Sequence, residues 1–295
     1  MNCKALTSRL MLALALALVL GITGPAAAQG NSVVIIGGST LGSCGNWWGS
    51  EANNMGATAG GCLPVTGPVG ELGDFSFAAM LPSDVSAASL APYDIAVLNV
   101  ASTAMSCNTD TLSAQQKADL VAFVEGGKKL IIYDSECYPV GYSWLPFPFT
   151  TANPGAMGAP GTFTIVEDNT LSSNDTADEH YIDAAHLGGD TDAVGDMNVM
   201  TTYDPNWCVD MSGTNFLGVT GPVHTYAKYP AGTDVGLIIY NGLDQDYQSS
   251  YYADAELRKI WLFELRQPVN PSNLPCGFTV VGITLSPPSA ENEIG

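Results

Sequence analysis

The chain has 295 residues, of which 9 are basic and 29 are acidic, and its formal net charge is −20 at neutral pH. This charge argues against a nucleic-acid partner, because the phosphates of nucleic acids require a basic surface. The length is sufficient for one large α/β domain with a substantial core.

Residues 1–28 have the composition of a secretory signal peptide. Lys4 and Arg9 precede an apolar run at 10–22, and alanines at 26–28 supply a small-residue cleavage site. Cleavage removes both basic residues, which leaves a net charge of 7 − 29 = −22. No later run is long and apolar enough to span a membrane. We therefore expect a secreted protein that is extracellular or held at the cell surface.

Export changes the interpretation of the cysteines. One of the 7 cysteines lies in the signal peptide, which leaves 7 − 1 = 6. An even number in an oxidising compartment favours disulfides over metal sites or reactive thiols. Sequence alone leaves every pairing formally open, but strand topology and loop boundaries favour one set. We expect the disulfides Cys107–Cys137, Cys44–Cys62 and Cys208–Cys276.

The sequence after the signal peptide predicts an alternation of strands and helices. Apolar runs indicate strands at 33–36, 75–80, 95–100 and 130–133, the last two typical of strands buried on both faces of a parallel sheet. A short helix is expected at 83–90. A longer helix is expected at 113–125, because Ser113 and Gln116 form a capping box and two glycines follow. Residues 95–133 thus predict a strand–helix–strand unit.

The later part of the chain is less regular. Strands are expected at 162–166, 224–229 and 235–240, and residues 168–200 are acidic and irregular. A closing helix is expected at 253–266, with apolar residues at helical spacing on one side. Ligands of such sheets bind beyond the carboxyl ends of the strands, where Asp134, Ser135 and Glu136 follow the strand at 130–133.

The main domain resembles the class I glutamine amidotransferase-like superfamily, which includes the trehalose-utilisation-type proteins. The resemblance is carried by VVIIGG at 33–38, LAPYDIAVLN at 90–99, LSAQQ at 112–116, FVEGGKKLII at 123–132 and GLIIYNGLD at 236–244. It implies a three-layer flavodoxin-like α/β domain over residues 29–276, with a mostly parallel sheet and long disulfide-tied loops.

The last residues resemble a different kind of domain. Residues 277–295 contain Leu-x-Pro-x-x-Ala-x-Asn-x-x-Gly at 285–295, which is similar to the opening strand of a bacterial immunoglobulin-like repeat. The resemblance implies a linker and the first strand of a truncated domain. The α/β domain would then be one module of a longer protein.

The resemblance also implies that catalysis is lost. Active members carry a nucleophilic cysteine at a glycine-flanked strand-to-helix elbow, and a His and a Glu after the late strand. Here Ser135 is nearest the nucleophile position without flanking glycines, and residues 241–246 contain no His. We therefore expect a non-catalytic binding or display module of a larger cell-surface or extracellular protein.

Two other functions remain open. The first is an extracellular hydrolase acting on glycans or peptides, with Asp134, Ser135, Glu136 and Asp244 as its catalytic groups. Such a hydrolase would lack a well-placed histidine to act as its general base. The second is a purely structural component of the cell envelope.

Four carboxylates follow the strands that end at this edge of the sheet. Asp134, Glu136, Asp244 and Asp246 could together hold Ca²⁺, which prefers oxygen ligands. The alternative, that they cap helices, bind turn amides or face water, is preferred. No other cofactor is expected.

Aromatic residues gather in the loops expected at the same edge. Exposed aromatics can stack on sugar rings or form an interface with another surface protein. Long loops of this kind also fold down as a self-packed cover over a sheet edge, and that alternative is preferred. The candidate ligand-binding residues are Trp47, Trp48, Tyr138, Tyr142 and Trp144.

Overall fold

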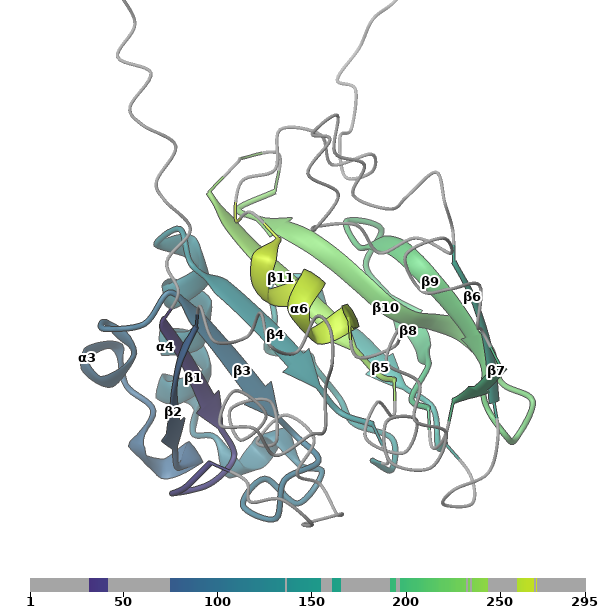
Figure 1. The fold of residues 1–295 in the computed structure, drawn as a ribbon, viewed down its shortest axis with the longest axis horizontal. Coiled ribbons are helices and arrows are strands. Elements are labelled where there is room, and N and C mark those ends of the chain that lie inside the picture. Colours follow the sequence, from purple (N-terminus) through teal and green to yellow (C-terminus); the bar gives the residue numbers. More distant parts are fainter. Residues whose placement is uncertain are drawn as a thin grey trace, which may run out of the picture. The chain divides into compact units, whose positions relative to one another are not determined.

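The computed structural model describes residues 32–41, 75–135, 137–154, 161–165, 192–194, 197–231, 233, 235–243, 259–267 and 269. These residues form a mixed nine-stranded sheet in the order β2-β1-β3-β4-β11-β10-β9-β6-β7 (Figure 1). A separate two-stranded sheet consists of β5 and β8. The expected α/β class is confirmed.

One half of the large sheet is parallel, and every strand in it was expected from its apolar run. The βαβ unit is also confirmed. Helix α4 begins after Ser113, whose side chain accepts from the Gln116 amide while Gln116 bonds back to the Ser113 amide, as the capping box predicted. The elements of this half are β2 (Ser76–Met80), β1 (Ser32–Ile36), β3 (Ile95–Asn99), α4 (Ala114–Glu125), β4 (Lys129–Tyr133) and β11 (Gly236–Asn241).

The other half of the sheet is antiparallel. Two of its connections are short: five residues join β9 to β10 and six join β10 to β11. Parallel neighbours need a crossover of roughly a dozen residues or more, so these strands can only pair as hairpins. β10 begins earlier than expected, and β9 was not predicted. The strands are β10 (Thr220–Tyr229), β9 (Cys208–Thr214), β6 (Gly161–Ile165) and β7 (Asp192–Val194).

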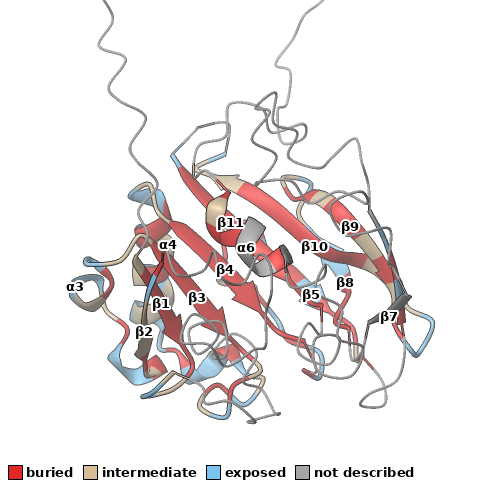
Figure 2. Ribbon diagram, viewed as in Figure 1, coloured by how far each residue is buried: buried red, intermediate tan, exposed pale blue. Residues whose placement is uncertain are grey.

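Side chains alternate along each strand, so the central strands present apolar residues on both faces of the sheet. One helix packs on each face. Leu130 and Ile132 of β4 join Leu120 of α4 in one apolar cluster. Ile131 and Tyr133 join Leu265 of α6 (Lys259–Arg266) in another. The central strands are therefore buried along their length, as Figure 2 shows.

The short helix expected at 83–90 is divided in two. A 3₁₀ turn, η2 (Pro82–Asp84), is followed by α3 (Ala87–Leu90), because Val85 and Ser86 are extended and Ser86 caps α3. The start of the helix expected at 253–266 lies outside the described residues.

The 3₁₀ turn η3 (Thr109–Thr111) follows β3 in the chain, and β5 (Phe149–Thr151) follows β4. β8 (Met200–Tyr203) comes later in the chain and pairs with β5 in the antiparallel direction. None of the described helices is long and apolar enough to cross a membrane.

Candidate functional site

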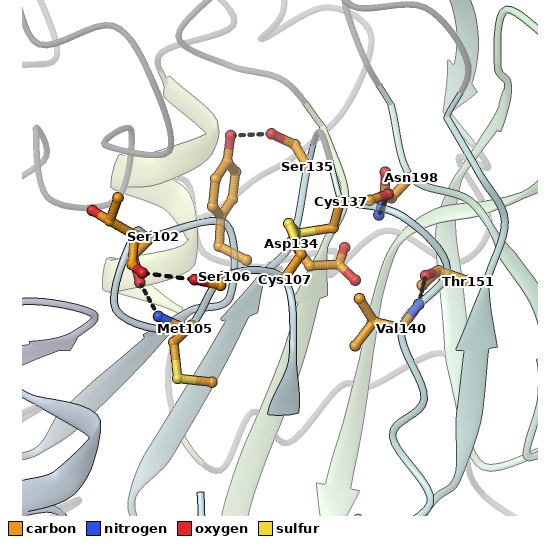
Figure 3. Close-up of a disulfide and its surroundings, with 12 residues drawn as sticks. Ser102, Met105, Ser106, Cys107, Asp134, Ser135, Cys137, Val140, Thr151 and Asn198 are labelled. Carbon is orange, nitrogen blue, oxygen red and sulfur yellow. Dashed lines mark hydrogen bonds between the residues drawn. A yellow bond between two sulfur atoms is a disulfide. The ribbon is translucent and has the colours of Figure 1, made fainter. Parts of the chain in front are cut away.

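A disulfide joins the loop that follows β4 to the loop that follows β3. Cys137 is bonded to Cys107, as predicted, and Cys137 is fully buried (Figure 3). Ser106 and Cys107 have φ angles of 50° and 55°, which is uncommon for residues other than glycine. Their amides donate to the carbonyls of Ser102 and Val100 at 2.7 and 2.9 Å, and these bonds hold the turn in place.

Asp134 lies on the α4 face of the sheet and is fully buried. Its two carboxylate oxygens accept hydrogen bonds from the hydroxyls of Tyr142 and Tyr240, both at 2.7 Å. Burial raises the pKa of Asp134 to about 7, against the opposing effect of hydrogen bonds from Tyr142, Tyr240 and Asn198. Burial and the neighbouring carboxylate also raise the pKa of both tyrosines, so they remain hydrogen-bond donors.

Ser135 takes part in a different group of contacts from its neighbour. Its hydroxyl lies 2.6 Å from the hydroxyl of Tyr133, whose ring packs in the α6-side cluster. Ser135 is fully buried. Asp134 and Ser135 therefore engage partners on opposite faces, as the alternation of side chains along a strand requires. The sequence placed them in one candidate site, but the structure does not bring their functional groups together.

A second polar cluster lies beside the end of β11, and His224 is at its centre. His224 of β10 pairs in register with Asn241, so the antiparallel half supplies the histidine that the late strand itself lacks. Its Nδ1 lies 2.8 Å from both oxygens of Asp210, and its Nε2 lies 2.9 Å from Oε1 of Glu264. Asn241 donates to the same Glu264 oxygen at 2.6 Å.

These groups are almost completely buried. Burial by itself would lower the pKa of His224, but the charges and hydrogen bonds of Asp210 and Glu264 raise it to about 10. The imidazolium therefore balances buried carboxylates. Among the described residues, the other oxygen of Glu264, Oε2, has no hydrogen-bond partner.

Lys129 extends this cluster along β4. Its Nζ donates to the backbone carbonyls of Glu264 and Leu265 at 2.7 and 2.8 Å. These carbonyls belong to the last turn of α6, where a cation is favoured by the helix dipole. Burial lowers the pKa of Lys129 to about 7, although the charge of Glu264 acts in the opposite direction.

The chemistry available to these residues is limited by their existing bonds. Cys137 offers no thiol, because its sulfur is in the disulfide. Both ring nitrogens of His224 are engaged by carboxylates, and the hydroxyl of Ser135 is engaged by Tyr133. Nucleophilic catalysis needs a nucleophile within hydrogen-bond reach of its base. No such pair occurs among these described residues.

The aromatic residues that were expected to bind a ligand differ in how far they are exposed. Tyr138 is 74% exposed, and Trp144 is partly buried against the α4-side core. The structure instead places Tyr142 wholly in the core, stacked on Phe149 at 4.2 Å between ring centroids, because its hydroxyl binds Asp134. Trp47 and Trp48 lie outside the described residues.

Several other predictions fall on residues outside the described ranges. Cys208 is disulfide-bonded, but its predicted partner Cys276 lies outside them. Within the described ranges, no group of three or more His, Cys, Asp or Glu side chains is arranged to hold a metal ion. The calcium site stays a prediction, although its first member, Asp134, already binds two tyrosines. Also outside the described ranges are Glu136, Asp244, Asp246 and the pair Cys44–Cys62.

Sequence reasoning did not identify the residues of the His224 cluster. Lys129 begins the otherwise apolar strand β4 and Asp210 lies between Val209 and Met211 of β9, and this pattern could have marked both as buried and paired. His224 lies in β10, whose mixture of polar and apolar residues gives no such signal. Their common location depends on the antiparallel half of the sheet, which was only partly predicted.

Comparison with known proteins gives distant likenesses. No protein-family profile matches the chain, and no curated protein matches its sequence. Among solved structures, Gan42B, a GH42 β-galactosidase from G. stearothermophilus, matches with a TM-score of 0.40 and 11% identity over 75% of this chain. The match spans only 29% of the β-galactosidase.

Two shorter proteins are matched along nearly their whole length. A cytoplasmic protein from Salmonella typhimurium has a TM-score of 0.45 and 9% identity, covering 80% of this chain and 97% of that protein. The N-terminal domain of mmIFT52 has a TM-score of 0.44 and 7% identity, covering 78% and 96%. Likenesses this distant establish neither a shared fold nor a shared activity.

Proposed function

We propose that this protein is an exported, non-catalytic member of the class I glutamine amidotransferase-like superfamily, and that it serves as a binding or display module of a larger cell-surface or extracellular protein. The proposed domain is three-layered and flavodoxin-like. Flavodoxin-like sheets have the strand order 2-1-3-4-5, and the parallel half here has the order β2-β1-β3-β4-β11. Helices α4 and α6 on opposite faces are consistent with three layers.

The proposal rests on the burial of the residues that follow β4, at the position of the strand-to-helix elbow in active members of the superfamily. Asp134, Ser135 and Cys137 are all fully buried, and each is bound to another part of the protein. Since these groups have no exposed surface, a substrate could reach them only if the residues around them moved. The disulfide also supports export, because such bonds persist mainly in oxidising compartments.

The test combines thiol labelling with activity assays. The protein is unfolded without reductant and treated with a thiol reagent, and peptide mapping is expected to show Cys107 and Cys137 unlabelled. The folded protein is then assayed for ammonia release from glutamine and for hydrolysis of peptides and glycosides. Background rates are expected throughout.

Two variants decide the interpretation of any activity. Ser135→Ala and Asp134→Asn remove the polar groups at the elbow and are checked for folding by circular dichroism. Turnover by the wild type that either folded variant loses would contradict a non-catalytic role. So would a labelled Cys137 in an active preparation.

A further inference from the structure

We propose that the groups that hold α6 against the sheet form a pH-compensated anchor, in which His224 carries the positive charge and Lys129 is a neutral amine in weakly alkaline solution. The anchor consists of Lys129 of β4, Asp210 of β9, His224 of β10 and Glu264 of α6, and each of these residues is at most 1% exposed. The inference goes beyond the proposed function, because none of the four residues belongs to the elbow after β4.

The contacts of His224 require a proton on both of its ring nitrogens. Nδ1 lies 2.8 Å from both carboxylate oxygens of Asp210, and Nε2 lies 2.9 Å from Oε1 of Glu264. An ionised carboxylate only accepts hydrogen bonds, so each nitrogen must donate one. The neutral ring has a single N–H, and its other nitrogen would face a carboxylate lone pair. The imidazolium form is therefore the one that fits these contacts.

The contacts of Lys129 fit a neutral amine. Its Nζ donates to the backbone carbonyls of Glu264 and Leu265 at 2.7 and 2.8 Å. Among the described residues, no ion pair includes Lys129. An ammonium has three N–H donors, whereas the neutral amine has two and a lone pair. The third N–H of a buried ammonium would lack an acceptor here, and a buried donor without a partner is costly.

The charged groups around the anchor act unequally on the two basic residues. Asp210 and Glu264 both contact His224, whereas only the more distant charge of Glu264 acts on Lys129. Tyr226 also faces Asp210, but burial and the Asp210 charge raise the pKa of its hydroxyl, so Tyr226 stays neutral. The described carboxylates therefore compensate a positive charge on His224 better than one on Lys129.

The pKa values of the two basic residues consequently move past each other. Burial lowers the pKa of Lys129 from 10.5 to about 7, and the charge of Glu264 offsets this only in part. Burial opposes the charge of His224 as well, but Asp210 and Glu264 raise its pKa from 6.5 to about 10. Between these limits the pair binds one proton, which is on Lys129 in the unfolded chain and on His224 in the folded protein.

Each residue alone would make stability depend on pH, in opposite directions. The stabilisation from His224 is complete below pH 6.5 and is lost as the pH rises through 10. The cost of burying charged Lys129 is complete below pH 7 and disappears as the pH rises to 10.5. The two changes cancel, because the pair binds the same number of protons in both states. The attachment of α6 is therefore constant over this range of pH.

The experiment is urea unfolding of the full chain, without reductant, at pH 7, 8, 9 and 10. The variants are His224→Gln, Lys129→Met and the double variant, and Lys117→Met is the control because Lys117 pairs with the exposed Asp110. Relative to wild type, the unfolding constant should fall about threefold to tenfold per pH unit in His224→Gln and rise by a similar factor in Lys129→Met. The ratio should stay constant in the double variant and in Lys117→Met.

NMR of the folded wild type tests the same assignment without relying on the stability of any variant. The side-chain carbon next to Nζ of Lys129 should titrate near pH 7, and the ring of His224 near pH 10. Titration of Lys129 near 10.5 or of His224 near 6.5 would overturn the inference. Slopes of the same sign in the two single variants would also overturn it, because the two residues would then not compensate each other.

Discussion

At the scale of single residues, His224 shows how a buried charge is tolerated. Its two ring nitrogens face Asp210 and Glu264, which come from β9 and α6, and Asn241 supports Glu264 from β11. A buried ion pair is costly to break, because the remaining partner is left uncompensated. We therefore expect this cluster to stabilise the packing of α6 against the antiparallel strands β9 and β10.

Replacing His224→Gln is expected to reduce the free energy of unfolding by about 3–5 kcal/mol, since two buried carboxylates lose their counter-ion. The effect should depend on pH. The pKa of His224 is raised from 6.5 to about 10 in the folded state, so its stabilisation is complete below pH 6.5 and disappears as the pH rises through 10.

Urea unfolding of the wild type and His224→Gln at several pH values between 6 and 10 would measure this dependence. Taking the difference between the two proteins cancels the other titrating groups. A stability difference that stayed constant or widened toward pH 10 would contradict the proposed imidazolium.

At the scale of elements, α6 is fastened to the sheet at its carboxyl end by Lys129. The lysine comes from β4 and donates to two backbone carbonyls in the last turn of the helix, where carbonyls have no partner four residues further on within the helix. Together with the Glu264–His224 contact, this places two polar attachments within one turn of α6. The apolar contact of Leu265 lies beside them.

Lys129→Met keeps most of the apolar stem but removes the donors, so the carbonyls of Glu264 and Leu265 each lose a hydrogen bond. We expect a loss of about 1–3 kcal/mol in the free energy of unfolding and faster amide hydrogen exchange in α6. The matched control is Lys117→Met. Lys117 pairs with Asp110 at 2.9 Å, but the Asp110 side chain is 84% exposed.

The control should change stability by less than about 1 kcal/mol, as exposed ion pairs do. Equal losses of unfolding free energy in Lys129→Met and Lys117→Met would show that the contact of Lys129 with α6 stabilises the protein no more than an exposed ion pair does.

At the scale of the whole molecule, the Cys107–Cys137 disulfide joins the loops after two neighbouring parallel strands. The cysteines are separated by 30 residues, and the loop between them contains α4. Constraining a loop of this size in the unfolded chain stabilises the folded state by roughly 3–4 kcal/mol in the chain-entropy account.

The double variant Cys107→Ala/Cys137→Ala is expected to lose about 2–4 kcal/mol in urea unfolding without reductant, where other disulfides stay intact. Hydrogen exchange should rise in residues 101–112 and 137–141. A loss below about 1 kcal/mol would mean that the hydrogen bonds around Ser102 and Val100 hold the turn without the bridge.

The predictions succeeded where local patterns were sufficient. Each of these patterns spans only a few neighbouring residues, and each was confirmed: the apolar runs of β1, β3 and β4, and the Ser113–Gln116 capping box. The Cys107–Cys137 pair followed from the βαβ topology. By contrast, β9 has small and polar residues on its outward side, so its pattern did not stand out.

The amino-acid sequence by itself determined the parallel strands, the α4 helix and the acidic charge. These depend on composition and on neighbours within one turn or strand. Only the tertiary structure decided that Asp134 and Ser135 engage opposite faces and that His224 meets Asp210 and Glu264. Each of these depends on strand register between distant segments, and register is set by the packing of the whole sheet.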